Sequence, residues 1–152
     1  GGTAGLIQAN TGLNMVFHNT QWVIALHAHT FLLTAVSSLV FAVLYALVPM
    51  LTKKEFRYPH LVNAHLWIWI VGAVLNAYAM GMAGSRGMLR RTLYEPGMFQ
   101  GYVGVAWVGG VLMGVALVLF LVNVGTLGLG EVIGLFVPDR WRRQAKVAPA
   151  RA

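Results

Sequence analysis

Cysteine is absent from this sequence of 152 residues, and charged residues are scarce at 10%. Without cysteine the chain forms no disulfide, no thiolate metal site and no C-x-x-C-H haem attachment. Acidic residues are rarest, with 4 Asp and Glu against 11 Lys and Arg. A metal site on this chain would therefore depend on histidine, carboxylate, methionine or backbone ligands.

Long stretches of this sequence contain no charge at all. No Lys, Arg, Asp or Glu occurs in residues 1–52, whereas soluble domains carry about 25% charged residues. Three charge-free segments, about 22–50, 61–83 and 98–124, each exceed the roughly 20 apolar residues that span a bilayer. The first segment lacks the basic start of a cleaved signal peptide. The sequence therefore predicts an all-α membrane protein with three transmembrane helices.

The remaining segments complete a three-part organisation. Residues 1–17 are apolar and rich in small residues, with turn residues at 10–12, and we expect them to be the end of a preceding transmembrane helix and an outer loop. Residues 18–130 would hold the three helices, and 131–152 would form a basic tail. Because the chain starts in the middle of a helical pattern and without Met, we expect it to be part of a larger protein.

Basic residues are distributed unevenly between the two predicted membrane sides. Eight of the eleven fall in the segment between the first two helices or in the tail. The positive-inside rule places both segments, and so the C-terminus, in the cytoplasm. Anionic lipid explains this charge. Nucleic acid is a poor explanation, because the chain has no soluble domain to present it.

The triplet His27-Ala28-His29 lies within the first charge-free segment. Ionisable groups at membrane depth are usually functional. Two helix positions correspond to about 200° of rotation, so the imidazoles leave opposite faces and can each bind a different metal centre. The polar stripe that continues from His27 along this helix, Thr30, Thr34, Ser37 and Ser38, suits either helix packing or a cofactor-facing or proton-conducting surface.

Haem explains this histidine pair together with His18, at the helix mouth, and with Arg90 and Arg91 in the second loop. Imidazole binds haem iron within a helix bundle, and the planar guanidinium suits haem propionates. Taken singly, the two arginines would more simply anchor lipid headgroups. His65, near the inner end of the second helix, is expected to make a structural hydrogen bond.

Several motifs resemble subunit I of the haem–copper oxygen reductases. GGTAGLIQANTGLNMVFHNTQWVIALHAHTF is similar to the passage from helix nine to helix ten of that family, HLWIWIVG to the start of helix eleven, and GMLRR to its G-M-P-R-R loop. The wording HNT-x-W resembles the B-type branch. The resemblance implies that the three helices are helices ten to twelve of a twelve-helix bundle in a prokaryotic plasma membrane.

The resemblance also implies roles for five residues. His27 would be the proximal ligand of the high-spin, oxygen-reducing haem, and His29 one axial ligand of the low-spin haem. Arg90 and Arg91 would pair with haem propionates. His18 would lie near those propionates and near the outer magnesium site of the family.

The sequence departs from the family pattern at four places. His27 follows His18 by nine positions where the family usually has eight, and the extra residue could be absorbed at the helix start or as a π-bulge. Asn19 replaces an aspartate, which removes an anionic ligand that magnesium favours. Leu89 replaces the loop proline, and Ala28 stands where phenylalanine is common.

The function implied is that of the C-terminal part of the catalytic subunit of a respiratory terminal oxidase, which reduces dioxygen to water with electrons from cytochrome c or quinol. Two haems are implied as cofactors. The active-site copper, its histidine ligands and the second ligand of the low-spin haem would come from the remaining helices of the subunit, and other oxidase subunits and the lipid bilayer are the further partners implied. Two alternatives remain open: a nitric oxide reductase-like member of the same superfamily, and a non-catalytic membrane b-type cytochrome or structural subunit.

Overall fold

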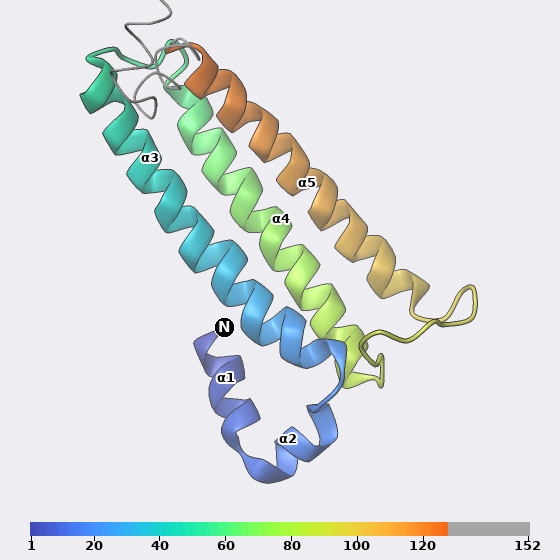
Figure 1. Cartoon of the computed structure of the whole chain (residues 1–152). Coiled ribbons are helices and arrows are strands. Elements are labelled where there is room, and N and C mark those ends of the chain that lie inside the picture. The colour runs from blue at the N-terminus through green and yellow to red at the C-terminus, as the bar shows by residue number, and fades with distance from the viewer. Residues whose placement is uncertain (128–152) are drawn as a thin grey trace, which may run out of the picture.

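A computed structural model describes residues 1–127, and within this range every regular element is a helix. Three continuous helices, Val23–Thr52, His60–Ser85 and Gln100–Gly125, are long and apolar enough to cross a membrane. This confirms the predicted all-α membrane fold. The basic tail predicted at 131–152 lies outside the described residues. The elements in chain order (Figure 1) are α1 Gly2–Ala9, α2 Thr11–Phe17, η1 Val23–Val36, α3 Ser37–Thr52, α4 His60–Ser85 and α5 Gln100–Gly125.

Helix α4 lies between the η1–α3 helix and α5, and it is the most buried of the three (Figure 1). Its contact with α5 is close because two glycines face each other: a Cβ on Gly72 would lie 2.7 Å from the Gly109 carbonyl oxygen, and a Cβ on Gly109 would lie 2.6 Å from the Gly72 carbonyl oxygen. Without a hydrophobic driving force between helices in lipid, such close backbone packing holds membrane helices together.

The two short N-terminal helices fold back beside the start of η1. Asn10 separates them, and its side chain caps α2 by accepting a hydrogen bond from the Leu13 N–H at 3.1 Å. The first long helix has a similar cap, because the Trp22 N–H donates to the Thr20 hydroxyl at 3.2 Å. Thr20 therefore caps the start of the first long helix.

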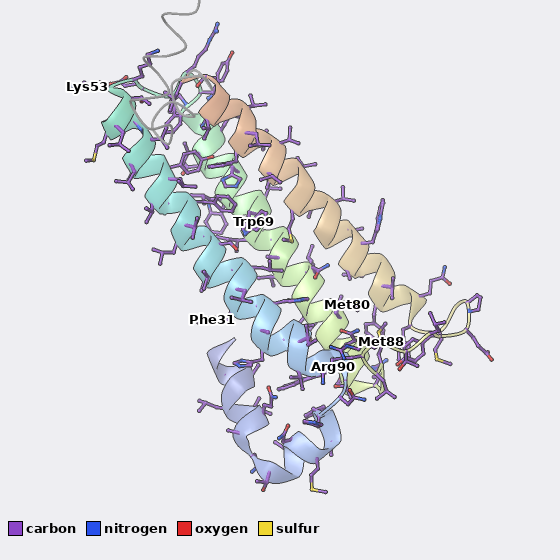
Figure 2. All side chains as sticks on the ribbon, viewed as in Figure 1. Phe31, Lys53, Trp69, Met80, Met88 and Arg90 are labelled. Carbon is purple, nitrogen blue, oxygen red and sulfur yellow. The ribbon has the colours of Figure 1, made fainter. Side chains whose placement is uncertain are left out.

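The segment η1, Val23–Val36, is a π-helix, in which hydrogen bonds join residues five apart. The Thr30 hydroxyl donates to the Ala25 carbonyl at 3.2 Å, again over five residues. Trp69 reaches across from α4 (Figure 2), and its indole N–H donates to the Leu33 carbonyl at 2.6 Å. His27 thus lies within a π-helical segment that is longer than the single π-bulge considered from the sequence.

Three of the four hydroxyl groups of the polar stripe form hydrogen bonds within their own helix. Thr34 donates to the Thr30 carbonyl, and Ser37 donates to the Leu32 carbonyl at 2.8 Å. These bonds fit the packing interpretation of the stripe, since such side chains satisfy backbone carbonyls in lipid. In the described structure the Ser38 hydroxyl is buried without a hydrogen-bond partner.

The charged loops lie at opposite ends of the bundle. Figure 2 shows Lys53 at one end and Arg90 at the other. We call these the lysine end, with Lys53, Lys54 and Arg57, and the arginine end, with Arg86, Arg90 and Arg91. This separation agrees with the sequence-based prediction that the two loops lie on opposite sides of the membrane.

His65 is fully buried between α3, α4 and α5. Its Nδ1 lies 3.2 Å from the Tyr45 hydroxyl, and the rings of Phe41 and Phe120 lie 4.5 and 5.3 Å from the imidazole centroid. This confirms the structural hydrogen bond expected for His65.

Candidate functional site

His27 points from η1 toward the start of α1. Its Nδ1 lies 2.9 Å from the Gly1 carbonyl oxygen, which also accepts the Gly5 N–H at 3.0 Å. Because a carbonyl only accepts, Nδ1 carries the proton and Nε2 keeps its lone pair. The ring has little spare room, since a Cβ on Gly5 would lie 2.7 Å from its Cε1 atom. The imidazole is thus held in the tautomer that binds a metal through Nε2.

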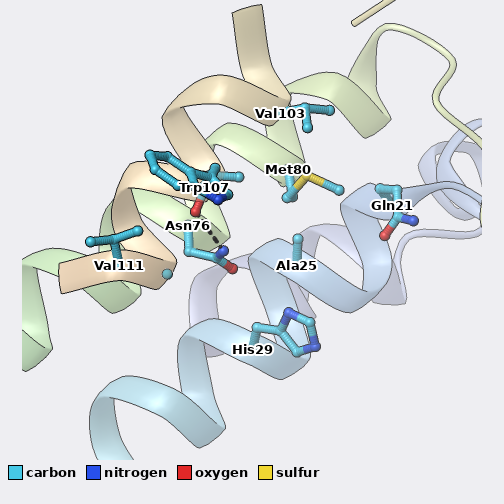
Figure 3. Close-up of a pocket in the computed structure, with 10 residues that line it drawn as sticks. Gln21, Ala25, His29, Asn76, Met80, Val103, Trp107 and Val111 are labelled. Atoms are coloured by element: carbon cyan, nitrogen blue, oxygen red, sulfur yellow. Dashed lines mark hydrogen bonds between the residues drawn. The ribbon is translucent and has the colours of Figure 1, made fainter. Parts of the chain in front are cut away.

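His29 points to a different side of η1. It lines a cavity of about 570 Å³ between η1, α4 and α5 (Figure 3), within the size range of cofactor pockets. Its other lining residues are mainly apolar, with two amide side chains and one indole: Gln21, Ala25, Asn76, Met80, Val103, Ala106, Trp107, Gly110 and Val111.

The two histidines of this helix therefore face different parts of the structure. The spacing argument predicted opposite faces for an α-helix, and the structure shows the same separation on a π-helix, with His27 against α1 and His29 toward α4 and α5. Within residues 1–127 no group of three or more His, Cys, Asp or Glu side chains could hold a metal ion. A single imidazole per site suits a metal that brings its own equatorial ligands, as haem iron does.

Arg90 is held against the segment that precedes η1. Its N–H donates to the Asn19 carbonyl at 2.9 Å, and its Nη2 lies 3.5 Å from the Asn19 side-chain oxygen. Two residues further along, the Gln21 N–H donates to the Met88 carbonyl at 2.8 Å, and Thr20 and Leu89 form an antiparallel bridge. These bonds fix the loop at residues 88–90 to the segment just before the helix that carries both histidines.

In the described structure the Arg90 Nε is buried without a hydrogen-bond partner. A buried guanidinium N–H that lacks a protein acceptor fits an anionic ligand. His18 lies next to Asn19 and is exposed, so it belongs to the same end of the bundle. Arg91 is exposed in a left-handed turn with φ of 57°. The structure thus brings Arg90 and the His18–Asn19 segment together, while Arg91 makes no comparable contact among the described residues.

Leu89 has a specific role where the family pattern has proline. Its N–H donates to the Tyr94 hydroxyl, which donates in turn to the Leu89 carbonyl at 3.2 Å. Proline has no N–H and could not make the first bond. Hydrogen bonds from the Tyr94 side chain therefore hold the loop where the family pattern would have the restricted backbone of proline.

Sequence reasoning gave no site role to several residues around His29. Asn76 donates its amide N–H to the Ala106 carbonyl at 2.9 Å, so one amide of the cavity wall is fixed by α5 (Figure 3). Met80 and Trp107 complete the wall. The sequence offered one signal, the amide side chain of Asn76 within a charge-free segment. It does not indicate that α4 and α5 meet at Asn76.

Together the helices and the site define an integral membrane protein that presents one imidazole on each side of a spanning helix. Residues 1–128 match the family described as Cytochrome C and Quinol oxidase polypeptide I. The chain belongs to this family, which confirms the resemblance seen in its motifs.

Two curated relatives are similar over most of the chain. The protein named cytochrome c oxidase polypeptide 1 from Halobacterium salinarum is 31% identical over 126 residues, which cover 83% of this chain and 21% of that protein. Cytochrome c oxidase subunit 1 from Yarrowia lipolytica is 29% identical over 121 residues, 80% of this chain and 22% of that protein. The chain thus spans about a fifth of the length of these relatives. No solved structure matches it significantly.

Proposed function

We propose that this chain is the C-terminal part of the catalytic subunit of a respiratory terminal oxidase, which reduces dioxygen to water with electrons from cytochrome c or quinol. One observation carries the proposal: two imidazoles on one spanning helix face two separate surroundings, and the tautomer of one is set for metal binding. Family membership supports the same reaction.

Two haems would supply electron transfer and oxygen binding, and copper would come from the rest of the subunit. His27 would bind the high-spin haem iron through Nε2, while the Gly1 carbonyl holds its Nδ1 proton and so keeps the imidazole oriented. His29 would supply one axial ligand of the low-spin haem from the wall of the cavity between η1, α4 and α5. The apolar lining would exclude water from that ligand.

Arg90 and Arg91 would neutralise propionates at the arginine end. Arg90 carries this part of the proposal, because its partnerless buried Nε and its anchorage on Asn19 fit a carboxylate ligand. His18 would border the same region. The protein would lie in a prokaryotic plasma membrane, as the family resemblance implies, and the distribution of basic residues supports a lysine end and a C-terminus that face the cytoplasm. The partners would be the remaining helices of subunit I, other oxidase subunits and the bilayer.

The test replaces each histidine by alanine in the complete subunit. We expect His27→Ala to abolish the carbon monoxide-reactive haem signal and His29→Ala to abolish the low-spin signal in reduced-minus-oxidised spectra. His60→Ala, at the exposed start of α4, is the matched control and should keep both haems.

An intact two-haem spectrum in either His27→Ala or His29→Ala would contradict that ligand assignment. A reduced wild-type complex that binds no carbon monoxide would favour the non-catalytic cytochrome. Iron in place of copper in the metal content would favour the nitric oxide reductase alternative.

A further inference from the structure

A second, smaller cavity opens on the outside of the bundle between α4 and α5. It has a volume of about 190 Å³ and is lined by Tyr78, Ala79 and Met82 of α4 and by Tyr102 and Val105 of α5. Tyr78 and Val105 are 58% and 46% exposed, so within residues 1–127 the groove is open on the outer side of α4 and α5. Its lining has no charged side chain and, unlike that of the cavity beside His29, no histidine.

Arg86 stands at the end of this groove. It directly follows the last residue of α4, and its guanidinium carbon lies 5.4 Å from the centroid of the Tyr102 ring. Cation–π contact of this kind holds an arginine against a tyrosine face. No carboxylate in residues 1–127 forms an ion pair with Arg86. Its positive charge therefore remains available to a ligand.

The dimensions of this arrangement match one leaflet of a bilayer. From Arg86 down α4 to Tyr78 is eight residues, or about 12 Å at the rise of an α-helix. Half of the hydrocarbon core measures about 15 Å. A headgroup at the level of Arg86 would therefore lead an acyl chain along the whole groove, and tyrosines are the side chains that favour the boundary between headgroup and hydrocarbon.

We propose that this groove binds an anionic phospholipid, with the phosphate at Arg86 and one acyl chain between Tyr78 and Val105. The charge of Arg86 is complementary to the phosphate, and the apolar lining is complementary to the acyl chain. Two arginines of this end turn toward different elements: Arg90 turns toward Asn19 and the histidine helix, whereas Arg86 turns toward α5. The proposal does not depend on the haem ligands.

The experiment uses the complete oxidase that contains this chain, reconstituted in nanodiscs of phosphatidylcholine with a minor fraction of phosphatidylglycerol. Bound lipid is measured by native mass spectrometry after detergent extraction. Arg86→Gln removes the charge, and Val105→Phe fills the groove while keeping the charge. Lys53→Gln, which removes an exposed charge at the lysine end, is the control. Haem spectra recorded on each variant report separately on the site at His27 and His29.

We expect retention of phosphatidylglycerol to fall about fivefold in Arg86→Gln, which is the contribution of one basic residue at an anionic lipid surface, and to fall also in Val105→Phe. Unchanged haem spectra in Arg86→Gln would show that the two sites are independent. If the Val105→Phe variant fails to assemble, the retention of phosphatidylglycerol by Arg86→Gln alone tests the proposal. Equal retention of phosphatidylcholine and phosphatidylglycerol by the wild type, or wild-type retention in Arg86→Gln, would overturn the proposal.

Discussion

The contact between Gly5 and the His27 imidazole gives a sharp test of how that ring is positioned. The change is Gly5→Ala in the complete subunit. The new methyl carbon would lie 2.7 Å from Cε1 and 3.0 Å from Nδ1 of His27. Both are side-chain ring atoms, so we expect the ring to move and the backbone of η1 to stay in place.

The size of the effect follows from the distances. Ordinary contact begins at 3.4 Å, so Cε1 must move by about 0.7 Å from its position at 2.7 Å. A movement of that size along the bond to the Gly1 carbonyl would lengthen it from 2.9 Å to about 3.6 Å, beyond a hydrogen bond. Loss of the bond costs about 0.5–1.5 kcal/mol, which is about two- to tenfold in the retention of a group bound by His27.

A matched control exists in the same helix. Gly2→Ala places its methyl group where nothing lies within 4 Å. Both substitutions replace a helical glycine by alanine, with a gain in helix propensity of up to about 1 kcal/mol at Gly5 and less at Gly2, the first residue of α1; only Gly5→Ala contacts the imidazole. The assay is the carbon monoxide difference spectrum of the reduced enzyme, with the low-spin band as internal standard.

We expect Gly5→Ala to shift or weaken the carbon monoxide-reactive signal while the low-spin band stays as in the wild type. The reasoning would be refuted if Gly5→Ala and Gly2→Ala gave the same spectrum. It would also be refuted if the low-spin band changed and the carbon monoxide signal did not, because His29 would then be the residue that responds.

Two further predictions concern stability, measured as the thermal midpoint of the complete subunit in detergent. Gly109→Ala should force α4 and α5 apart at the Gly72 carbonyl and destabilise by about 1–3 kcal/mol, whereas Gly114→Ala, with open space around it and away from the cavity beside His29, should have little effect; equal midpoints would contradict the backbone contact. Tyr45→Phe should leave the buried His65 Nδ1 without its partner, at a cost of about 1–3 kcal/mol, and an unchanged midpoint would show that this bond contributes nothing.

Much of the fold could be predicted because the bilayer constrains it strongly. Charge-free segments had to be spanning helices, and the predicted 22–50, 61–83 and 98–124 lie within about two residues of the ends of the helices at 23–52, 60–85 and 100–125. The opposite directions of His27 and His29 also followed from spacing alone. Both inferences use local periodicity, which a single sequence contains.

Other features depend on contacts between distant segments. The wall that Asn76 and Trp107 form beside His29 exists because Gly72 and Gly109 let two helices approach. The extent of the π-helix is linked to Trp69, which bonds to a carbonyl of η1 from another helix. Neither pairing leaves a periodic signal, so sequence reasoning had no means to find it. The haem-ligand roles themselves stay predictions until the histidine variants are measured.

The placement of both imidazoles on η1 has a mechanical consequence. Because they leave opposite sides of one rigid helix, a rotation of η1 about its axis carries His27 and His29 in opposite directions at once. The two imidazoles share a single rotational degree of freedom, and neither ring can be moved by rotating the helix without moving the other. Independent adjustment of the two rings must therefore come from the neighbours of each, such as Gly5 on one side and Asn76 on the other.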